Sequence, residues 1–186
     1  MLAVRTRRHN LAGRGIQHHG GTGGVAVIAD TPWHAKKAAA AVTVQWDHGP
    51  AATLSSAAVM TQLTQALDQA QGFGYHSVGD VDKALQGAAT TLTADYRAPY
   101  LAHATMEPIN CTVQFKDGAA SVWTSTQVPG LARMAAAKAL GIDEDKVTVH
   151  QLLLGGGFGR RLEVDYVAQA AAIAKAAGGA PVQTLW

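Results

Sequence analysis

Four glycines fall within five residues, from Gly155 to Gly159, and Phe158 is the one residue that interrupts them. Glycine has no Cβ, so it reaches positive φ without strain and lets backbone N–H groups lie directly against a ligand. Successive N–H groups in such a turn bind anions, and the N-terminus of a following helix adds positive potential. Arg160 and Arg161 follow with forked donors suited to phosphate. The alternative is a tight, buried connection between a strand and a helix, with both arginines simply solvated.

Two further polar side chains lie in an apolar setting between Pro99 and Pro108. His103 and Glu107 are four residues apart, which on a helix would place both on one face. Such a pair could act as a general acid and base, or as two ligands of a metal. The flanking prolines disfavour a long helix. The alternative is therefore a histidine and a glutamate that hydrogen-bond backbone groups in a buried loop.

Familiar phosphate-binding and nucleophile motifs do not fit this sequence. A P-loop needs Gly-Lys-Ser/Thr, where this chain has Gly159-Arg160-Arg161, and a dinucleotide pattern begun at Gly155 puts an arginine at its last glycine. No Gly-x-Ser-x-Gly elbow offers a serine nucleophile. The single cysteine, Cys111, is expected to be a small buried thiol and excludes an internal disulfide or a cysteine-rich metal site. A nucleotide-binding enzyme is the least favoured alternative.

The composition describes a chain that can bury a core. Its 186 residues are 48% hydrophobic and 15% charged, which suits one large domain or two small ones rather than a disordered chain. A net charge of +2 is too small to indicate a nucleic acid as partner. No run of 18 apolar residues and no signal-peptide h-region occurs. With no export signal the chain as it stands is predicted to be cytoplasmic, but the sequence does not establish its compartment.

The patterns along the first half of the chain predict a small strand–helix–strand unit and then a connecting region. Residues 1–24 show little periodicity and are predicted to be disordered. From residue 25 the alternation of strand and helix signals is typical of the edge of an α/β layer. The predicted elements are a strand at 25–29, a helix at 32–42 capped by Asp30 or Thr31, a strand at 43–47, a helix at 59–70 opened by Ser55 or Ser56, a short helix at 81–85 capped by Asp80, and a strand at 91–96.

The sequence pattern of the second half of the chain differs from that of the first half. This second half contains the glycine turn. Helical spacing of Leu131, Met134, Ala135 and Ala139 predicts that these four residues form a core-facing stripe. The predicted elements are a hairpin of 111–115 and 120–124 around a turn at 116–118, a helix over 131–139 that ends at Gly141, a buried strand at 147–154, a helix at 164–177 and an unfinished strand at 181–186.

Three motifs occur in the order and at the spacing found in one enzyme family. They are AHATMEPINC at 102–111, WTSTQVP at 123–129 and GGGFGRR at 155–161. Together they resemble the molybdopterin-binding large subunit of the xanthine dehydrogenase/aldehyde oxidase family. Within that family the chain is most similar to the beta subunit of isoquinoline 1-oxidoreductase and to related membrane-associated aldehyde dehydrogenases. The likeness runs from about residue 25 to the C-terminus.

The resemblance implies an α+β fold in two parts. Residues 25–90 would be a remnant of the family's α/β hammerhead domain with a connector. Residues 91–186 would be part of the molybdopterin-binding α/β domain, and residues 1–24 would lie outside the family or be disordered. The chain would then be a fragment of a larger subunit. The family's catalytic glutamate belongs to a later domain, so we expect no catalytic residue and no protein metal ligand here, and we expect the isolated chain to be inactive.

The resemblance also implies the chemistry of the intact enzyme, a molybdenum hydroxylase. An oxo–sulfido molybdenum centre held by a pterin, expected in its cytosine dinucleotide form and absent from this chain, would add water-derived oxygen to an aldehyde or an N-heterocycle. Electrons would leave through an iron–sulfur small subunit. The implied cofactor-binding residues are Gly156, Gly157, Phe158, Gly159, Arg160 and Gln127, and the implied substrate contact is Glu163.

Two positions depart from the family pattern. Leu101 stands where xanthine-type members carry a glutamine that contacts the molybdenum oxo group, and Glu163 falls one position later than their substrate-contacting glutamate. A different class of function therefore stays open: a stand-alone binding or interaction domain that kept the fold without catalysis. An exposed apolar surface, which a homodimer could cover, is expected of a fragment, whereas a polar surface is expected of a self-sufficient domain.

Overall fold

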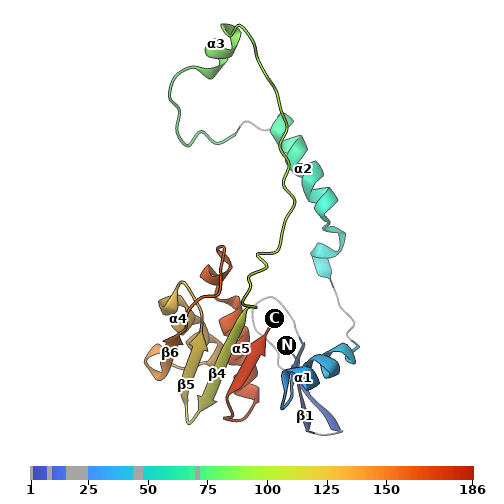
Figure 1. Cartoon of the computed structure of the whole chain (residues 1–186), viewed down its shortest axis with the longest axis vertical. Coiled ribbons are helices and arrows are strands. Elements are labelled where there is room, and N and C mark those ends of the chain that lie inside the picture. Colours follow the sequence, from blue (N-terminus) through green and yellow to red (C-terminus); the bar gives the residue numbers. More distant parts are fainter. Residues whose placement is uncertain (1, 8–9, 16–24, 44–47, 70–71) are drawn as a thin grey trace. The chain divides into compact units, whose positions relative to one another are not determined.

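The computed structural model describes residues 2–7, 10–15, 25–43, 48–69 and 72–186. The chain divides into two compact units (Figure 1). One consists of Met1–Val44 and His103–Trp186, and the other is Gln45–Ala102. The glycine turn and every residue assigned above to cofactor or substrate lie in the first unit.

A four-stranded sheet carries the second half of the chain. Its strands are β4 (Asn110–Lys116), β5 (Ala119–Thr124), β6 (Val147–Gln151) and β7 (Val182–Leu185), in the order β6-β5-β4-β7. β5 and β6 are parallel, and the other two pairs are antiparallel. The β4–β5 turn has φ of 51° at Asp117 and 76° at Gly118, the two positive values that a tight hairpin turn needs. The predicted hairpin is confirmed, as is the last strand.

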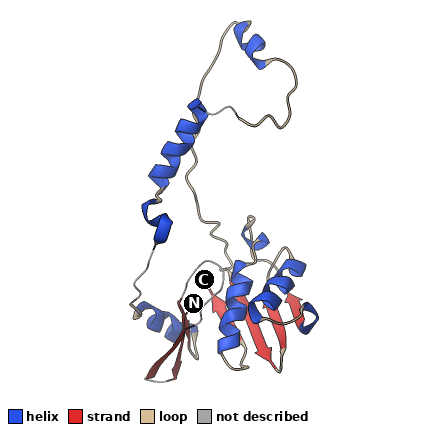
Figure 2. Ribbon diagram, turned by 180° about the vertical axis from the view of Figure 1, so that it is seen from behind, coloured by secondary structure: helices blue, strands red, loops and turns tan. Residues whose placement is uncertain are grey.

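Two helices cover one face of this sheet (Figure 2). α4 (Pro129–Leu140) and α5 (Asp165–Ala176) pack on each other, and they contact β6 and β4 respectively. Cys111 and Val113 of β4 alternate toward the helices and are fully buried, as a half-buried strand requires. The buried core as a whole is made of Cys111, Val113, Ala120, Val122, Ala132, Ala136, Ala137, Leu140, Val147, Tyr166, Val167, Ala170, Ala171 and Ala174.

The predicted core face of α4 is wrong. Leu131 and Met134 are about half exposed, whereas Ala132, Ala136 and Leu140 are buried. The alanines of α4 meet a stripe of alanines on α5, and small side chains allow two helices to approach closely. Helical spacing alone could not show which of two overlapping apolar stripes would face the partner helix.

β6 also differs from its prediction. The sequence predicts a buried strand over 147–154, but the strand ends at Gln151 and only Val147 of it is buried. β6 pairs with β5 alone and lies at the edge of the sheet. The apolar residues that follow, Leu152 and Leu153, are 44% and 96% exposed. The apolar character of 147–154 thus predicts a core strand, but the residues after Gln151 form the exposed segment that leads to the glycine turn.

The start of the chain is more regular than expected. β1 (Leu2–Arg7) pairs with β2 (Asn10–Gly15) and with β3 (Val25–Ile28), so the expectation of disorder is wrong for the described residues before 25. α1 (Pro32–Ala40) begins as predicted, with the Thr31 hydroxyl accepting from the His34 amide at 3.2 Å. The strand predicted at 43–47 lies outside the described residues, apart from its first position.

The described residues of the second unit form helices but no buried core. It contains a 3-10 turn at Gly49–Thr53, α2 (Ser56–Gln69) and α3 (Val81–Gln86), and neither helix has a buried residue. Ser55 and Asp80 cap α2 and α3 as predicted. The strand predicted at 91–96 is wrong, because this segment pairs with no described strand and is exposed throughout. Alternation makes a strand only when a neighbouring strand is present.

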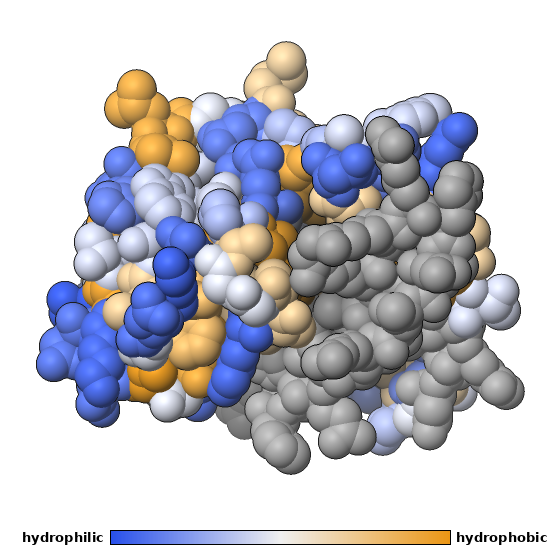
Figure 3. Space-filling view, turned by 90° about the horizontal axis from the view of Figure 1, so that it is seen from below, coloured by the Kyte–Doolittle hydropathy of each residue, from blue (hydrophilic) through white to orange (hydrophobic). Residues whose placement is uncertain are grey.

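Large apolar side chains stand exposed in both units. Phe73, Tyr75, Leu92 and Tyr96 of the second unit are each more than 90% exposed. On the face drawn in Figure 3, hydrophobic and hydrophilic side chains are interspersed. None of the described helices is both long enough and apolar enough to cross a bilayer.

Candidate functional site

The glycine turn is strained at its centre and open to solvent. Gly156 and Gly159 have φ of 101° and 90°, and Phe158 between them has φ of 49°. A positive φ is unusual for a bulky side chain and clusters at functional sites. The Phe158 side chain is 77% exposed, so no burial of its ring accounts for this conformation.

Four consecutive amides of the turn have no acceptor within the part of the chain that the structure describes. No described residue accepts a hydrogen bond from the N–H groups of Gly156, Gly157, Phe158 or Gly159. The amides on either side are used: Gly155 donates to Glu107 Oε2 at 2.7 Å, and Arg160 donates to the Gly157 carbonyl at 2.8 Å. A row of unused amides is the arrangement expected for an anion site.

The need for glycine differs along the turn. A Cβ on Gly155 would lie 2.4 Å from Glu107 Cβ, which leaves no room for any side chain. A Cβ on Gly157 would lie 3.2 Å from Gln127 Oε1. At Gly159 a Cβ would meet nothing within 4 Å. The beginning of the turn is therefore tightly packed against Glu107, although Gly155 itself is exposed, whereas the end of the turn faces open space.

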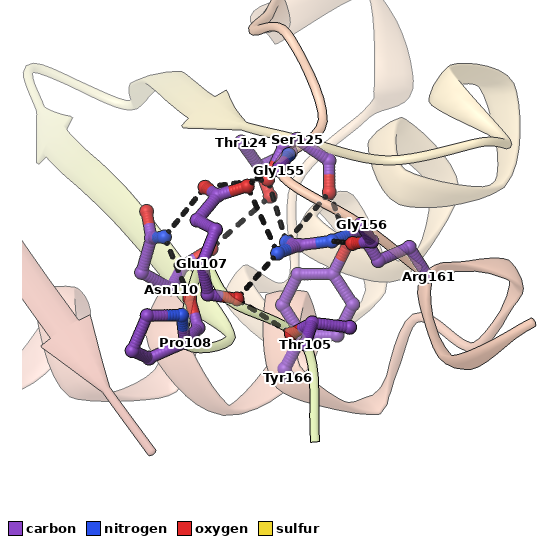
Figure 4. A network of polar contacts seen from close by, with 10 residues as sticks. All are labelled: Thr105, Glu107, Pro108, Asn110, Thr124, Ser125, Gly155, Gly156, Arg161 and Tyr166. Carbon is purple, nitrogen blue, oxygen red and sulfur yellow. Dashed lines mark hydrogen bonds and ion pairs between the residues drawn. The ribbon is translucent and has the colours of Figure 1, made fainter. Parts of the chain in front are cut away.

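Arg161 is not available to a phosphate, which corrects the role predicted from its charge. Its side chain is fully buried, and all five of its N–H donors have acceptors within the chain. Nε donates to the Gly156 carbonyl at 2.6 Å, Nη1 to Ser125 O at 3.3 Å and Oγ at 2.6 Å, and Nη2 to Glu107 O and Oε2, both at 2.9 Å (Figure 4).

Glu107 completes this network as an anion. Burial raises the pKa of its carboxyl, but hydrogen bonds from the Gly155 amide, Asn110 and Ser125, together with the charge of Arg161, outweigh burial and leave the pKa lowered. Glu107 accepts a hydrogen bond from a backbone amide within a loop, as the alternative proposed, but that loop is largely exposed rather than buried. His103 is exposed and lies outside any helix, so the predicted pairing of His103 with Glu107 on one helix face is wrong.

Arg160 and Glu163 follow the turn, with Arg160 partly exposed and Glu163 exposed. The Arg160 guanidinium forks the Asp165 carboxylate with two contacts of 2.8 Å, and this hydrogen bonding raises its pKa. Asp165 lies in the first turn of α5. The predicted gain in positive potential from that helix start is therefore offset by a carboxylate of its own. Glu163 is exposed and ends the 3-10 turn η3 (Arg160–Leu162).

Gln127 is brought to the glycine turn from the end of β5. Its backbone N–H donates to the Arg161 carbonyl at 3.1 Å, and its side-chain oxygen lies beside Gly157. Gln127 and the turn were both predicted to bind cofactor from separate motifs, and the structure brings them together. Arg160, also predicted to bind cofactor, has its guanidinium committed to Asp165.

Sequence reasoning missed Ser125, Thr105 and the true role of Arg161. Ser125 and Thr126 are fully buried polar residues directly after β5, and the Thr105 hydroxyl donates to the Glu107 carbonyl at 2.6 Å. Small hydroxyl residues at the end of an apolar strand were a usable signal. Nothing local indicated that their partner would be an arginine 36 residues later.

The other candidate groups form no site. Cys111 is buried, and burial raises the pKa of its thiol to about 12 in spite of a hydrogen bond with Thr124. Within the described part of the chain, no group of three or more His, Cys, Asp or Glu side chains is placed to hold a metal ion.

Residues 68–186 match the sequence model of the molybdopterin cofactor-binding domain. This match covers more than half of the chain, and it includes the hairpin, both sheet-covering helices and the glycine turn.

Several relatives are similar to the chain over about half or more of its length. A membrane-bound aldehyde dehydrogenase [pyrroloquinoline-quinone] of Gluconacetobacter polyoxogenes is 34% identical over 88% of the chain and 21% of its own length. The xanthine dehydrogenase molybdenum-binding subunit of Escherichia coli O157:H7 is 28% identical over 93% of the chain and 23% of its own length. Isoquinoline 1-oxidoreductase subunit beta of Brevundimonas diminuta is 44% identical over 49% of the chain and 11% of its own length.

A solved structure shares the fold. Quinoline 2-oxidoreductase from Pseudomonas putida 86 superposes with a TM-score of 0.60 at 18% identity, over 85% of this chain and 21% of that one. The chain thus spans about a fifth of the length of the relatives that it matches over most of its own length.

Proposed function

The chain belongs to the molybdopterin cofactor-binding domain family, and from this premise we propose that it forms part of the cofactor site of a molybdenum hydroxylase. The observation that carries the proposal is the row of open amides from Gly156 to Gly159. Oxo and dithiolene groups carry negative charge, and backbone donors fixed in advance stabilise such charge without reorganisation.

The residues present fit such a group. The end of the turn faces open space at Gly159, the four amides there donate to no described residue, and the Gln127 side chain stands beside Gly157. In the proposed site Gly156, Gly157, Phe158 and Gly159 offer backbone donors, and Gln127 offers its amide group. When bound, the cofactor supplies the two-electron oxidation that places water-derived oxygen on a substrate carbon. Arg160 contributes a positive charge near the proposed site, and its guanidinium is already paired with the Asp165 carboxylate.

The finer parts of the proposal rest on the relatives. Their names support an aldehyde or an N-heterocycle as substrate and a multi-subunit enzyme. We carry over an iron–sulfur small subunit as partner, the cytosine dinucleotide form of the pterin, and Glu163 as a substrate contact. We also keep residues 25–90 as a hammerhead remnant with connector and residues 91–186 as the cofactor-binding part. The quinone in one relative's name is not carried over, because the family match is to a molybdopterin domain.

Activity of the isolated chain is a separate matter. Because the proposed site holds no catalytic base from this chain, we expect the purified chain to contain no stoichiometric molybdenum and to reduce no dye with an aldehyde. Aldehyde-dependent turnover by the chain alone would contradict the proposal that it is one part of a larger active site. The alternative is a stand-alone interaction domain, for which the exposed apolar residues of the first unit would have to be covered by a partner or by a second copy.

A chimera tests the function directly. Residues 100–186 of this chain would replace the segment that aligns with them in the isoquinoline 1-oxidoreductase beta subunit, a relative that is 44% identical over 92 residues of the chain. We expect the chimera to retain molybdenum and substrate-dependent dye reduction, and Gly159→Ala in it to reduce both. Gly118→Ala is the matched control. Gly118 also has positive φ and open space where a Cβ would be added, but it lies in the hairpin turn. A folded chimera without molybdenum would contradict the proposal.

A further inference from the structure

We infer that Arg161 is the positioning residue of the proposed cofactor site, which it serves by fixing the glycine turn and the Gln127 segment against each other. This inference deepens the proposed function and rests on it. The arginine stands inside the GGGFGRR motif, where its charge suggests a ligand contact, but the geometry assigns it a different task.

The first observation is how completely Arg161 is used. Its five N–H donors reach five acceptors on three segments of the chain: the loop before β4, the end of β5 and the glycine turn itself. Its side chain has no exposed surface. A guanidinium in this state has no donor left for an outside anion, so the contribution of Arg161 to a ligand must pass through the groups that it holds.

The second observation is that both the backbone carbonyl and the side chain of Arg161 make hydrogen bonds within the proposed site. Its own carbonyl accepts the Gln127 amide at 3.1 Å and the Thr126 hydroxyl at 3.2 Å. Its Nε holds the Gly156 carbonyl at 2.6 Å. One residue therefore fixes the Gly156–Gly157 peptide, which carries one of the open amides, and also the segment that carries Gln127. These are the two halves of the proposed site.

The third observation is that, of the three backbone carbonyls that Arg161 holds, one depends on Arg161 alone. The Glu107 carbonyl also accepts from Thr105, and the Ser125 carbonyl also accepts from the Tyr166 hydroxyl. The Gly156 carbonyl has no second donor among the described residues. This carbonyl sits at a glycine with φ of 101°, where backbone freedom is greatest. Loss of the guanidinium should thus free the glycine turn before it frees either of the other segments.

The test uses the full chain, labelled with ¹⁵N, and no ligand. Backbone order parameters would be measured for Gly156, Gly157 and Gly159 in the wild type and in Arg161→Lys. Lysine keeps the charge but has three donors on one atom, which cannot span five acceptors. We expect values of about 0.85 in the wild type and below about 0.6 in Arg161→Lys, whereas α5 and the sheet stay rigid. Arg160→Lys is the matched control and should leave the turn rigid.

Two further outcomes decide the inference. An Arg161→Lys variant that is folded and keeps a rigid glycine turn would overturn it. If that variant does not fold, the wild type decides: the Arg161 Nε–H should exchange slowly with solvent and show a scalar coupling across its hydrogen bond to the Gly156 carbonyl, whereas the partly exposed Arg160 Nε–H should exchange quickly. Absence of that coupling, or rapid exchange of the Arg161 Nε–H, would then overturn the inference. These measurements need no cofactor, so a failed chimera with a loosened turn would refute the proposed function and leave the role of Arg161 in the chain intact.

Discussion

At the scale of single residues, the network around Arg161 and Glu107 shows why charge alone gave a wrong prediction for the two arginines. GGGFGRR presents two adjacent arginines, and both were expected to be available to an anion. Arg161 turns inward and Arg160 turns to Asp165, because each finds a carboxylate elsewhere in the fold. The Glu107 partner of Arg161 is 54 residues away in sequence, and no local pattern could reveal that pairing. The glycines themselves were predictable, since their requirement is a property of the backbone.

The lowered pKa of Glu107 gives a prediction for stability against pH. A carboxyl whose pKa is lower in the folded chain than its ordinary value of 4.5 stabilises the fold above that value. This contribution is lost as the pH falls through the folded pKa. Urea unfolding should therefore show the wild type losing stability on acidification below about 4.5, and Glu107→Gln losing less. Asp30 and Asp165 also have lowered pKa values and remain in both chains, so the difference isolates Glu107.

Cys111 gives a second residue-scale prediction. Its thiol is buried among apolar side chains, and burial raises its pKa to about 12. At neutral pH the reactive thiolate is therefore nearly absent. We expect a thiol reagent to label Cys111 only after denaturant unfolds the chain. Rapid stoichiometric labelling of the native chain would show that β4 opens readily or that the packing described for it is wrong.

At the scale of elements, the sequence predicted correctly those features that depend only on neighbouring residues. The Asp117–Gly118 turn, the Thr31 and Asp80 caps and the Gly141 helix end each depend on a few neighbouring residues. It failed where a second element decides the outcome. The segment 91–96 has strand-like alternation but no strand beside it, and the buried stripe of α4 was set by the alanines of α5.

Gly141 tests the helix ends quantitatively. It follows α4 with φ of 73°, and a Cβ there would be 3.9 Å from its nearest neighbour, Lys175 Nζ, which is ordinary contact. Gly141→Ala should thus cost only the backbone strain, about 1–2 kcal/mol. Gly130 lies in the first turn of the same helix with open space around it, so Gly130→Ala should be stabilising by up to about 1 kcal/mol. Denaturant midpoints measure both, and equal effects would contradict the left-handed helix end.

At the scale of the whole molecule, two units of different character share one chain. The first has a sheet covered by two helices and a core, whereas the second has capped helices without a buried residue. The sequence indicated two parts and a connector, but not that the connector would lack a core. The alternation at 91–96 predicted a strand, and the structure shows none there.

This difference predicts where a protease cuts. Phe73, Tyr75 and Tyr96 are more than 90% exposed, whereas Tyr166 in the first unit is 1% exposed. Limited chymotrypsin digestion of the chain should cleave first between residues 72 and 100, with fragments identified by mass spectrometry. Early cleavage at Tyr166, or lasting resistance of the second unit, would contradict the division into one packed and one coreless unit.

The central claim is that the amides of the glycine turn form an anion site, and an amide titration with molybdate tests it most directly. In the ¹⁵N-labelled chain we expect the signals of Gly156, Gly157, Phe158 and Gly159 to shift together and to saturate. Gly159→Ala should weaken this binding, and the hairpin control Gly118→Ala should not. Signals that do not move, or that move only around lysines such as Lys116, would contradict the claim.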